Sequence, residues 1–245
     1  AAARADLRAV LALTGDSPAE WTGNLLLDDL LGAEVRWLGN ASWNELPKRL
    51  AAIAEGEKEA GYLPYIIPLG GSTPIGALGY IAAMQEFMEQ CQEAELQFDR
   101  IVIASSSGGT QCGMLIGAEM YGFKGQITAV SIAESAPELK TRVSKLMNQT
   151  LTLLNRPVSV PSSRVQVVDR FLGGGYAVVG DAEREAVRLL ASREGILVGP
   201  VYTGRALAGL LEMIRAGDIS TSERILFWHT GDTAAIFAWG RELRA

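Results

Sequence analysis

Residues 101–120 read IVIASSSGGTQCGMLIGAEM. Residues 101–104 are an apolar, mostly β-branched run typical of a buried strand. Small hydroxyl residues and two glycines follow at positions 105–110, and from Gln111 the apolar residues recur at a spacing that suits a helix packed on a sheet. In such a strand–loop–helix unit, backbone N–H groups and the helix dipole converge on an anion. The stretch therefore suggests a phosphate site, with Ser107 and Thr110 as additional hydroxyl donors.

This loop by itself does not specify a ligand. It matches neither the GxGxxG dinucleotide fingerprint nor the GxxxxGK[ST] P-loop, because no lysine follows the glycines. An ordinary tight turn between a strand and a helix would have the same composition. Both interpretations stay open at this level, since a local fold feature does not determine function.

Apolar runs alternate with helical patterns along most of the chain. We expect strands at residues 8–13, 34–38, 65–68, 101–104, 126–132, 165–168 and 224–228. We expect helices at residues 24–31, 43–59, 75–95, 111–120, 135–154, 182–193, 205–216 and 234–244, with Asp181 as the cap of the sixth. This alternation predicts an α/β protein with doubly wound, mostly parallel sheets.

Four loops that follow predicted strands or strand-like runs are rich in glycine and hydroxyl residues. They are residues 105–110, 173–176, 199–204 and 229–232. In open parallel sheets, ligands bind beyond the carboxyl ends of the strands. We therefore expect these loops to form one pocket.

Composition excludes several classes of function. The formal net charge is −6, and no basic cluster is interleaved with aromatic residues, so nucleic acid is not an expected partner. Cys91 and Cys112 offer neither a disulfide framework nor a CxxC motif, which favours a reducing cytoplasm. The single histidine, His229, disfavours a histidine metal site or a Ser-His-Asp triad, and we expect no metal. No apolar run reaches the roughly 18 residues that span a bilayer, so no membrane is expected either.

Six segments together resemble one enzyme family. They are TGNLLLDDLLGAEVR (22–36), IPLGGSTPIGALGY (67–80), SSSGGTQCG (105–113), SIAESAPELK (131–140), GPVYTGRALAGL (199–210) and ILFWHTGDTAAIFAW (225–239). In this order they resemble the D-cysteine desulfhydrase and 1-aminocyclopropane-1-carboxylate deaminase family, pyridoxal-phosphate enzymes with a fold like that of the tryptophan synthase β-subunit. The resemblance implies two domains, with residues 1–75 part of a small α/β domain and residues 76–245 the large cofactor-binding domain.

The resemblance also implies roles for individual residues. Ser107, Gly108, Gly109 and Thr110 resemble the cup that holds the phosphate of pyridoxal 5'-phosphate, which agrees with the interpretation of the loop given above. Thr203 resembles the group that meets the pyridine nitrogen. The deaminase members carry a glutamate at this place, and a carboxylate would hold that nitrogen protonated and strengthen the electron sink. With a hydroxyl at this place, the pyridine ring withdraws electrons less strongly, which favours the desulfhydrase members of the family.

Tyr202 and Tyr176 resemble two active-site tyrosines that could shuttle protons or orient the substrate. The alternatives are a packed aromatic at a strand end for Tyr202 and a solvent-facing side chain for Tyr176. His229 and Thr230 suit a structural role as well as they suit cofactor contact. The Gly-Gly-Ser run at positions 70–72 is expected to form an inter-domain turn.

One departure from the family concerns the lysine that forms a Schiff base with the cofactor. The family places it in a GGNK-like context upstream of anything present here, and its Ser-Asn substrate loop is also absent. The lysines of this chain, none in such a context, are Lys48, Lys58, Lys124, Lys140 and Lys145. The chain also opens without Met, as if inside an αβ unit. We therefore expect an N-terminally truncated copy that holds pyridoxal phosphate noncovalently.

The implied reaction of the complete protein is α,β-elimination from a small β-substituted amino acid. The main expectation is conversion of D-cysteine to pyruvate, ammonia and sulfide by a cytoplasmic homodimer. Alternatives within the class are an L-cysteate sulfo-lyase, which releases sulfite, and a 1-aminocyclopropane-1-carboxylate deaminase. Alternatives from other classes are a noncatalytic fragment or binding protein, favoured by the lysine deficit, and a phosphosugar or nucleotide binder, which leaves Thr203 and both tyrosines unexplained.

Overall fold

The computed structural model describes residues 1–244, and the chain divides into two compact units, Ala1–Pro68 and Leu69–Ala245. We expected the division near residue 75. Because the units divide after Pro68, the Gly-Gly-Ser run at positions 70–72 belongs to the second unit. This assignment matters for the site described below.

The first unit is a small parallel βαβ arrangement followed by a helix. Its elements are η1 (Ala3–Ala5), β1 (Val10–Leu13), α1 (Gly23–Leu30), β2 (Glu34–Trp37) and α2 (Leu46–Glu59). Strands β1 and β2 pair in parallel. Glu57 of α2 accepts hydrogen bonds from both Arg8 and Arg36, which ties the helix to the two strands. The Arg8 guanidinium foremost keeps the pKa of Glu57 below its usual value.

The second unit contains a four-stranded parallel sheet in the order β5-β4-β3-β6. Its strands are β3 (Arg100–Ser105), β4 (Gln126–Ser131), β5 (Gln166–Val168) and β6 (Ile225–Phe227). From β3 the chain moves outward to β4 and β5, and it then returns to add β6 on the opposite side of β3. The strand order therefore reverses between β3 and β6, and ligands in open parallel sheets bind beside such a switch point.

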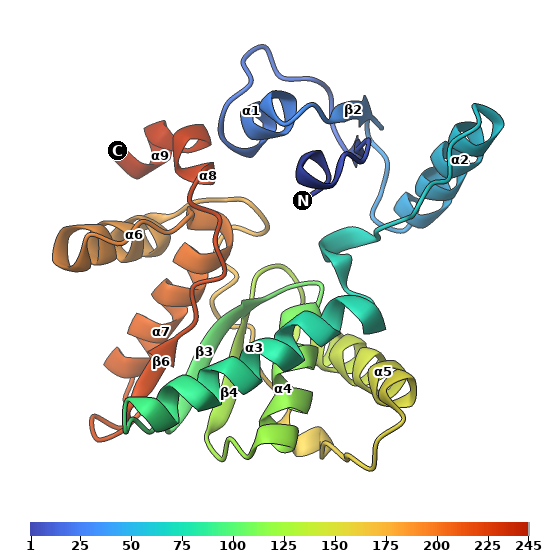
Figure 1. Cartoon of the computed structure of the whole chain (residues 1–245). Coiled ribbons are helices and arrows are strands. Elements are labelled where there is room, and N and C mark those ends of the chain that lie inside the picture. The colour runs from blue at the N-terminus through green and yellow to red at the C-terminus, as the bar shows by residue number, and fades with distance from the viewer. Residues whose placement is uncertain (245) are drawn as a thin grey trace. The chain divides into compact units, whose positions relative to one another are not determined.

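Helices cover both faces of this sheet (Figure 1). The longer elements are α3 (Pro74–Glu93), α4 (Gly109–Tyr121), α5 (Ala136–Leu154), α6 (Asp181–Glu194) and α7 (Arg205–Arg215), and the shorter ones are η2 (Leu69–Gly71), η3 (Ser162–Arg164), η4 (Pro200–Gly204), α8 (Ala235–Ala238) and α9 (Gly240–Arg244). Ile101 and Ile103 of β3 pack with α3, α4 and α5, whereas Val102 and Ala104 pack with α6 and α7. Burial on both faces explains why β3 is apolar at every central position.

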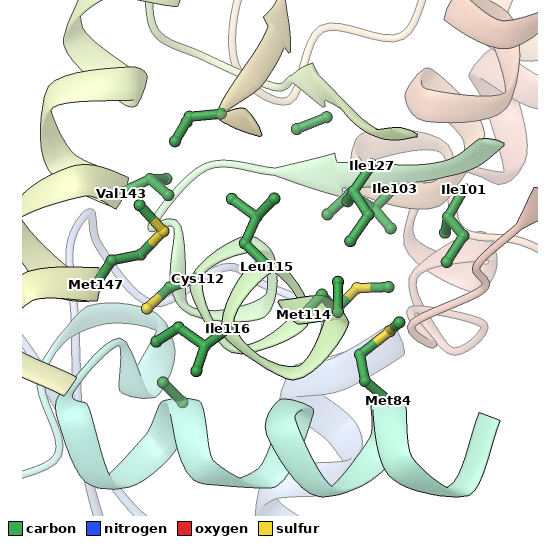
Figure 2. Packing of buried hydrophobic residues seen from close by; sticks show 14 of the residues in the cluster. Met84, Ile101, Ile103, Cys112, Met114, Leu115, Ile116, Ile127, Val143 and Met147 are labelled. Atoms are coloured by element: carbon green, nitrogen blue, oxygen red, sulfur yellow. The ribbon is translucent and has the colours of Figure 1, made fainter. Parts of the chain in front are cut away.

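Helices α3 and α4 approach each other closely because glycine lines the contact. A Cβ atom on Gly113 of α4 would lie 2.3 Å from the Ala77 carbonyl oxygen of α3. Figure 2 shows the side chains that fill the surrounding core, including Met84 on α3, Leu115 on α4 and Ile103 on the sheet. These residues are fully buried, so this side of the sheet provides a rigid base for the loop that follows β3.

The predicted α/β class with parallel sheets is confirmed, whereas three local expectations are wrong. Residues 65–68 form no strand: Pro64 and Pro68 remove backbone donors at both ends of the run. The predicted helix at 234–244 is two short helices, α8 and α9, which are separated at Trp239. Asp181 is the first residue of α6 rather than its cap, and the Glu183 carboxylate instead accepts the Gly180 N–H at 2.9 Å.

The two cysteines are expected to differ in reactivity. Cys112 is fully buried, and burial raises the pKa of its thiol to about 11, whereas Cys91 is only partly buried. Because the thiolate is the reactive form, iodoacetamide at pH 8 should label Cys91 in the folded protein and label Cys112 only after denaturation. Mass spectrometry of the labelled peptides checks this order, and equal labelling of both residues in the folded protein would contradict it.

Candidate active site

The loop after β3 leads directly into the N-terminus of α4. Gly108 has φ 90° and precedes the helix, which begins at Gly109. This left-handed conformation suits glycine. The first N–H groups of a helix have no acceptor within the helix and carry its positive dipole. Residues 107–110, named here the cup, thus combine the N–H groups at a helix N-terminus with the Ser107 and Thr110 hydroxyls, as the sequence suggested for a phosphate.

Ser72 is part of this cup, although the sequence did not indicate it. Its hydroxyl accepts the Gly109 N–H at 3.0 Å and donates to the Ser107 hydroxyl at 2.7 Å. A Cβ atom on Gly70 would lie 2.3 Å from Ser107 Oγ, so only glycine allows this approach. The Gly-Gly-Ser run at positions 70–72 therefore lies against the Ser-Gly-Gly-Thr run of the cup. The signal that could have revealed it is the repeated pairing of glycines with a hydroxyl residue.

Thr203 lies in the π-helical turn η4, which the Gly204 N–H closes by donating to Gly199 O at 2.7 Å. Its side chain is fully buried. The hydroxyl lies 3.3 Å from Gly199 O and 3.2 Å from Gly231 O, so it links the turn to the loop after β6. Single π-helical turns occur frequently at functional sites. A buried hydroxyl whose hydrogen-bond acceptors are two backbone carbonyls can reorient toward a ligand.

Tyr176 and Tyr202 meet through their hydroxyl groups, which are 2.6 Å apart. Their rings pack edge to face, with centroids 6.0 Å apart and an interplanar angle of 73°. Burial foremost raises the pKa of Tyr202, and the Tyr176 hydrogen bond and the negative charges of Asp232 and Glu134 raise it further. Tyr202 therefore stays protonated at neutral pH and can hold a proton for a ligand. Tyr176 is 43% exposed but is oriented by this contact.

His229 holds two loops together through its ring nitrogens. The Gly231 N–H donates to Nδ1 at 3.1 Å, so Nε2 carries the proton and donates to Leu197 O at 3.1 Å. Thr233 Oγ1 donates to the same carbonyl at 3.2 Å. Both ring nitrogens thus contact backbone groups, which favours the structural role over acid–base work. Thr230 is exposed.

Direct contacts connect three of the four loops that the sequence placed at one end of the sheet, and the fourth, residues 105–110, follows a strand that contacts one of them. The Tyr176–Tyr202 hydrogen bond joins loops 173–176 and 199–204, and the Thr203 hydroxyl joins the latter to loop 229–232. Strand β3, which ends at the cup, contacts η4. The cup follows β3 and loop 229–232 follows β6, so the group lies beside the switch point of the sheet.

The side chains of all five lysines are exposed. Lys48 and Lys58 belong to α2, Lys124 precedes β4, and Lys140 and Lys145 belong to α5. In residues 1–244, no hydrogen bond joins any of them to the cup or to Thr203, Tyr176 or Tyr202. Within the same residues there is also no group of three or more His, Cys, Asp or Glu side chains placed to hold a metal ion.

No helix in the described part of the chain is both long and apolar enough to cross a membrane.

Comparisons with known proteins find similar sequences along most of this chain. A "Putative 1-aminocyclopropane-1-carboxylate deaminase" of Pyrococcus abyssi is 36% identical over 247 residues, covering 99% of this chain and 72% of that protein. A "D-cysteine desulfhydrase" of Salmonella paratyphi C is 35% identical over 217 residues, covering 89% of this chain and 64% of that protein. The chain thus spans about two thirds of the length of these relatives.

Solved structures support the same relationship. The crystal structure of an "ACC deaminase homologue" superposes with a TM-score of 0.88 at 34% identity, over 99% of this chain and 71% of that one. A serine racemase from Dictyostelium discoideum has a TM-score of 0.59 at 16% identity, over 94% of this chain and 70% of that one, and it shares the fold alone. The predicted fold and the resemblance to the desulfhydrase and deaminase proteins are therefore confirmed.

The residues at the site fit pyridoxal phosphate at both ends. The cup has hydroxyl and helix N-terminal N–H groups of the kind that bind a phosphate, and glycine at position 70 allows the Ser107 hydroxyl to lie in the cup without a clash. Thr203 has a fully buried hydroxyl, the group that the family resemblance assigns to the pyridine ring. The covalent lysine has no counterpart among the five exposed lysines. The profile of the family described as "Pyridoxal-phosphate dependent enzyme" matches residues 1–231, and the chain belongs to this family.

Proposed function

We propose that the protein is a pyridoxal-phosphate lyase that eliminates a β-substituent from a small amino acid, D-cysteine foremost, to give pyruvate, ammonia and sulfide. The relative from Salmonella paratyphi C that bears the name D-cysteine desulfhydrase is 35% identical over 89% of the chain. The choice of reaction rests on Thr203, whose side chain is fully buried and which the family resemblance aligns with the glutamate of the deaminase members. The proposal concerns the activity of the whole protein, because the 245 residues of this chain span about two thirds of the length of the named relatives.

In the proposed reaction, the cup, Thr203 and the two tyrosines would have separate roles. The N–H groups and hydroxyls of the cup would bind the phosphate, with Ser72 holding the Ser107 hydroxyl in place. Thr203 would meet the pyridine nitrogen. When bound, the cofactor supplies an electron sink for the pair released from Cα. Tyr202 would hold a proton near the substrate, and Tyr176 would orient the Tyr202 hydroxyl.

Thr203 favours elimination over ring opening for an electrostatic reason. A carboxylate beside the pyridine nitrogen keeps that nitrogen protonated, whereas a neutral hydroxyl does not. The resulting weaker sink suffices for a substrate with a good leaving group at Cβ, such as a thiolate. Opening an unactivated three-membered ring requires more withdrawal of electrons, so the hydroxyl disfavours the deaminase reaction.

A substrate comparison tests the proposal. The protein is supplied with pyridoxal phosphate and offered D-cysteine, L-cysteate or 1-aminocyclopropane-1-carboxylate, and sulfide, sulfite and 2-oxobutyrate are measured. We expect sulfide and pyruvate from D-cysteine. Sulfite as the only sulfur product would replace the proposal with a cysteate lyase, and 2-oxobutyrate as the main product would replace it with a deaminase. Thr203→Ser, which keeps the hydroxyl, should retain the activity that Thr203→Val loses.

A noncatalytic role is the second candidate, and the exposure of all five lysines favours it for this chain. Under that role, pyridoxal phosphate would bind without a covalent bond, leave on dialysis and show the absorbance of the free aldehyde. None of the three substrates would be turned over. An absorbance band of lysine-linked cofactor from this chain, together with sulfide release, would exclude it.

Location and assembly are further proposals. Cys91 and Cys112 are both free thiols in the structure, which suits a reducing cytoplasm. We propose a homodimer there, to be checked by light scattering of the purified protein.

A further inference from the structure

Arg205 is a buried charge that the proposed reaction does not use. It is the first residue of α7, three positions after Tyr202, and only 1% of it is exposed. A buried arginine is costly unless its N–H groups are satisfied and its charge is paired. The hydrogen-bond acceptors of Arg205 therefore indicate the role of this buried side chain.

The guanidinium of Arg205 binds four acceptors from separate parts of the second unit. Nε donates to Glu183 Oε1 at 2.7 Å, and Nη1 donates to the Ile132 carbonyl, just after β4, at 3.1 Å. Nη1 also donates to Gly175 O at 2.8 Å, and Nη2 donates to Val178 O at 2.6 Å. Two of the four bonds thus go to backbone carbonyls on either side of Tyr176.

The loop that carries Tyr176 needs such support. Gly173, Gly175 and Ala177 have φ values of 57°, 108° and 60°. The left-handed region is unfavourable for alanine, so the loop keeps this conformation only if other contacts impose it. The bonds from Arg205 to Gly175 O and Val178 O enclose the strained residue.

Glu183 fixes the orientation of the guanidinium. The carboxylate is buried, with 4% of the residue exposed, and its second oxygen accepts the Gly180 N–H at the start of α6. The pair is therefore anchored to α6 on one side and to α7 on the other. A planar fork held in this way can aim Nη1 and Nη2 at two carbonyls at once, which a lysine ammonium cannot do.

We propose that Arg205 is a positioning residue: its bonds to the carbonyls of Gly175 and Val178 hold the loop so that the Tyr176 hydroxyl stays on the Tyr202 hydroxyl. The hydrogen bonds on which this proposal rests join residues of the chain alone. Its importance for turnover rests on the proposed function, in which Tyr202 holds a proton near the substrate.

The test follows the tyrosine pair by fluorine NMR of protein that contains 3-fluorotyrosine. Tyr176→Phe and Tyr202→Phe assign the two signals, and Tyr176→Phe also defines the shift of the Tyr202 signal when its partner hydroxyl is lost. We expect Arg205→Lys to move the Tyr202 signal in the same direction and by a comparable amount. The matched control is Arg215→Lys, the same change on the same helix at an exposed ion pair with Glu185, which should leave the signal in place.

A second variant covers the case in which Arg205→Lys does not fold. The double variant Arg205→Gln with Glu183→Gln leaves no unpaired buried charge, but the side chain at position 205 can no longer reach the carbonyls of both Gly175 and Val178. It should shift the Tyr202 signal as Tyr176→Phe does. A folded Arg205 variant with the wild-type signal would overturn the proposal, because a purely structural arginine would lower stability without moving Tyr202. Turnover is recorded separately: a wild-type protein that releases no sulfide ends the proposed lyase but leaves this result intact.

Discussion

Replacement of Gly108 by alanine is expected to weaken binding of pyridoxal phosphate by roughly 10- to 150-fold. Gly108 has φ 90°, and a Cβ atom there would lie 2.9 Å from Val143 Cγ2. The loop must therefore change its conformation, and at least one N–H group of the cup would no longer reach the phosphate. A hydrogen bond to a charged group contributes about 1.5–3 kcal/mol, which corresponds to that loss of affinity. Equilibrium dialysis of the purified protein measures it.

The control lies at the other end of the same helix. Gly122 has φ 82°, and a Cβ atom there would meet nothing within 4 Å. Gly122→Ala should therefore cost a similar conformational energy of about 1–2 kcal/mol without changing cofactor affinity. Pyridoxal, which lacks the phosphate, should bind the Gly108 variant and the wild type equally. Equal loss of pyridoxal phosphate in both glycine variants would show that the cup is not the phosphate site.

Gly113→Ala is expected to destabilise the second unit by about 1–3 kcal/mol, the usual cost of overpacking a core. The added Cβ would lie 2.3 Å from Ala77 O and 2.6 Å from Tyr80 Cβ, and a backbone carbonyl in a helix cannot move aside freely. Helices α3 and α4 must then separate, which also loosens the base under the cup. Thermal unfolding followed by circular dichroism should show a midpoint that is lower by several degrees.

Gly79→Ala is the matched control for this change. Gly79 lies on α3, is exposed, and has nothing within 4 Å of the position of a Cβ atom. Alanine favours a helix over glycine by up to about 1 kcal/mol, so this variant should be as stable as the wild type or more stable. A similar midpoint for both alanine variants would mean that the close contact between α3 and α4 contributes nothing.

Local structure that depends on neighbours in sequence could be predicted. The cup follows a buried strand and precedes a helix, and the local pattern of residues 101–111 contains all of that information. The roles of Ser72 and Arg205 could not be predicted in this way. Ser72 meets Ser107 across 35 residues of sequence, and Arg205 reaches Ile132, 73 positions earlier. Such contacts depend on how helices pack on the sheet, which a local pattern does not encode.

The tyrosines illustrate the same difference. Sequence suggested Tyr176 and Tyr202 by resemblance, but it left a solvent-facing side chain for Tyr176 and a packed aromatic for Tyr202 as alternatives. The 2.6 Å contact between their hydroxyls exists because Arg205 holds a strained glycine loop in place. Only the folded chain brings these groups together.

The amino-acid order alone determined the class of fold and the strand–loop–helix unit that contains the cup, since apolar periodicity and glycine spacing are local properties. Tertiary structure decided which groups share the site. In the folded chain, Ser72 contacts the cup, the His229 ring contacts backbone groups, and the two tyrosine hydroxyls meet. These arrangements arise from the packing of distant segments around one parallel sheet.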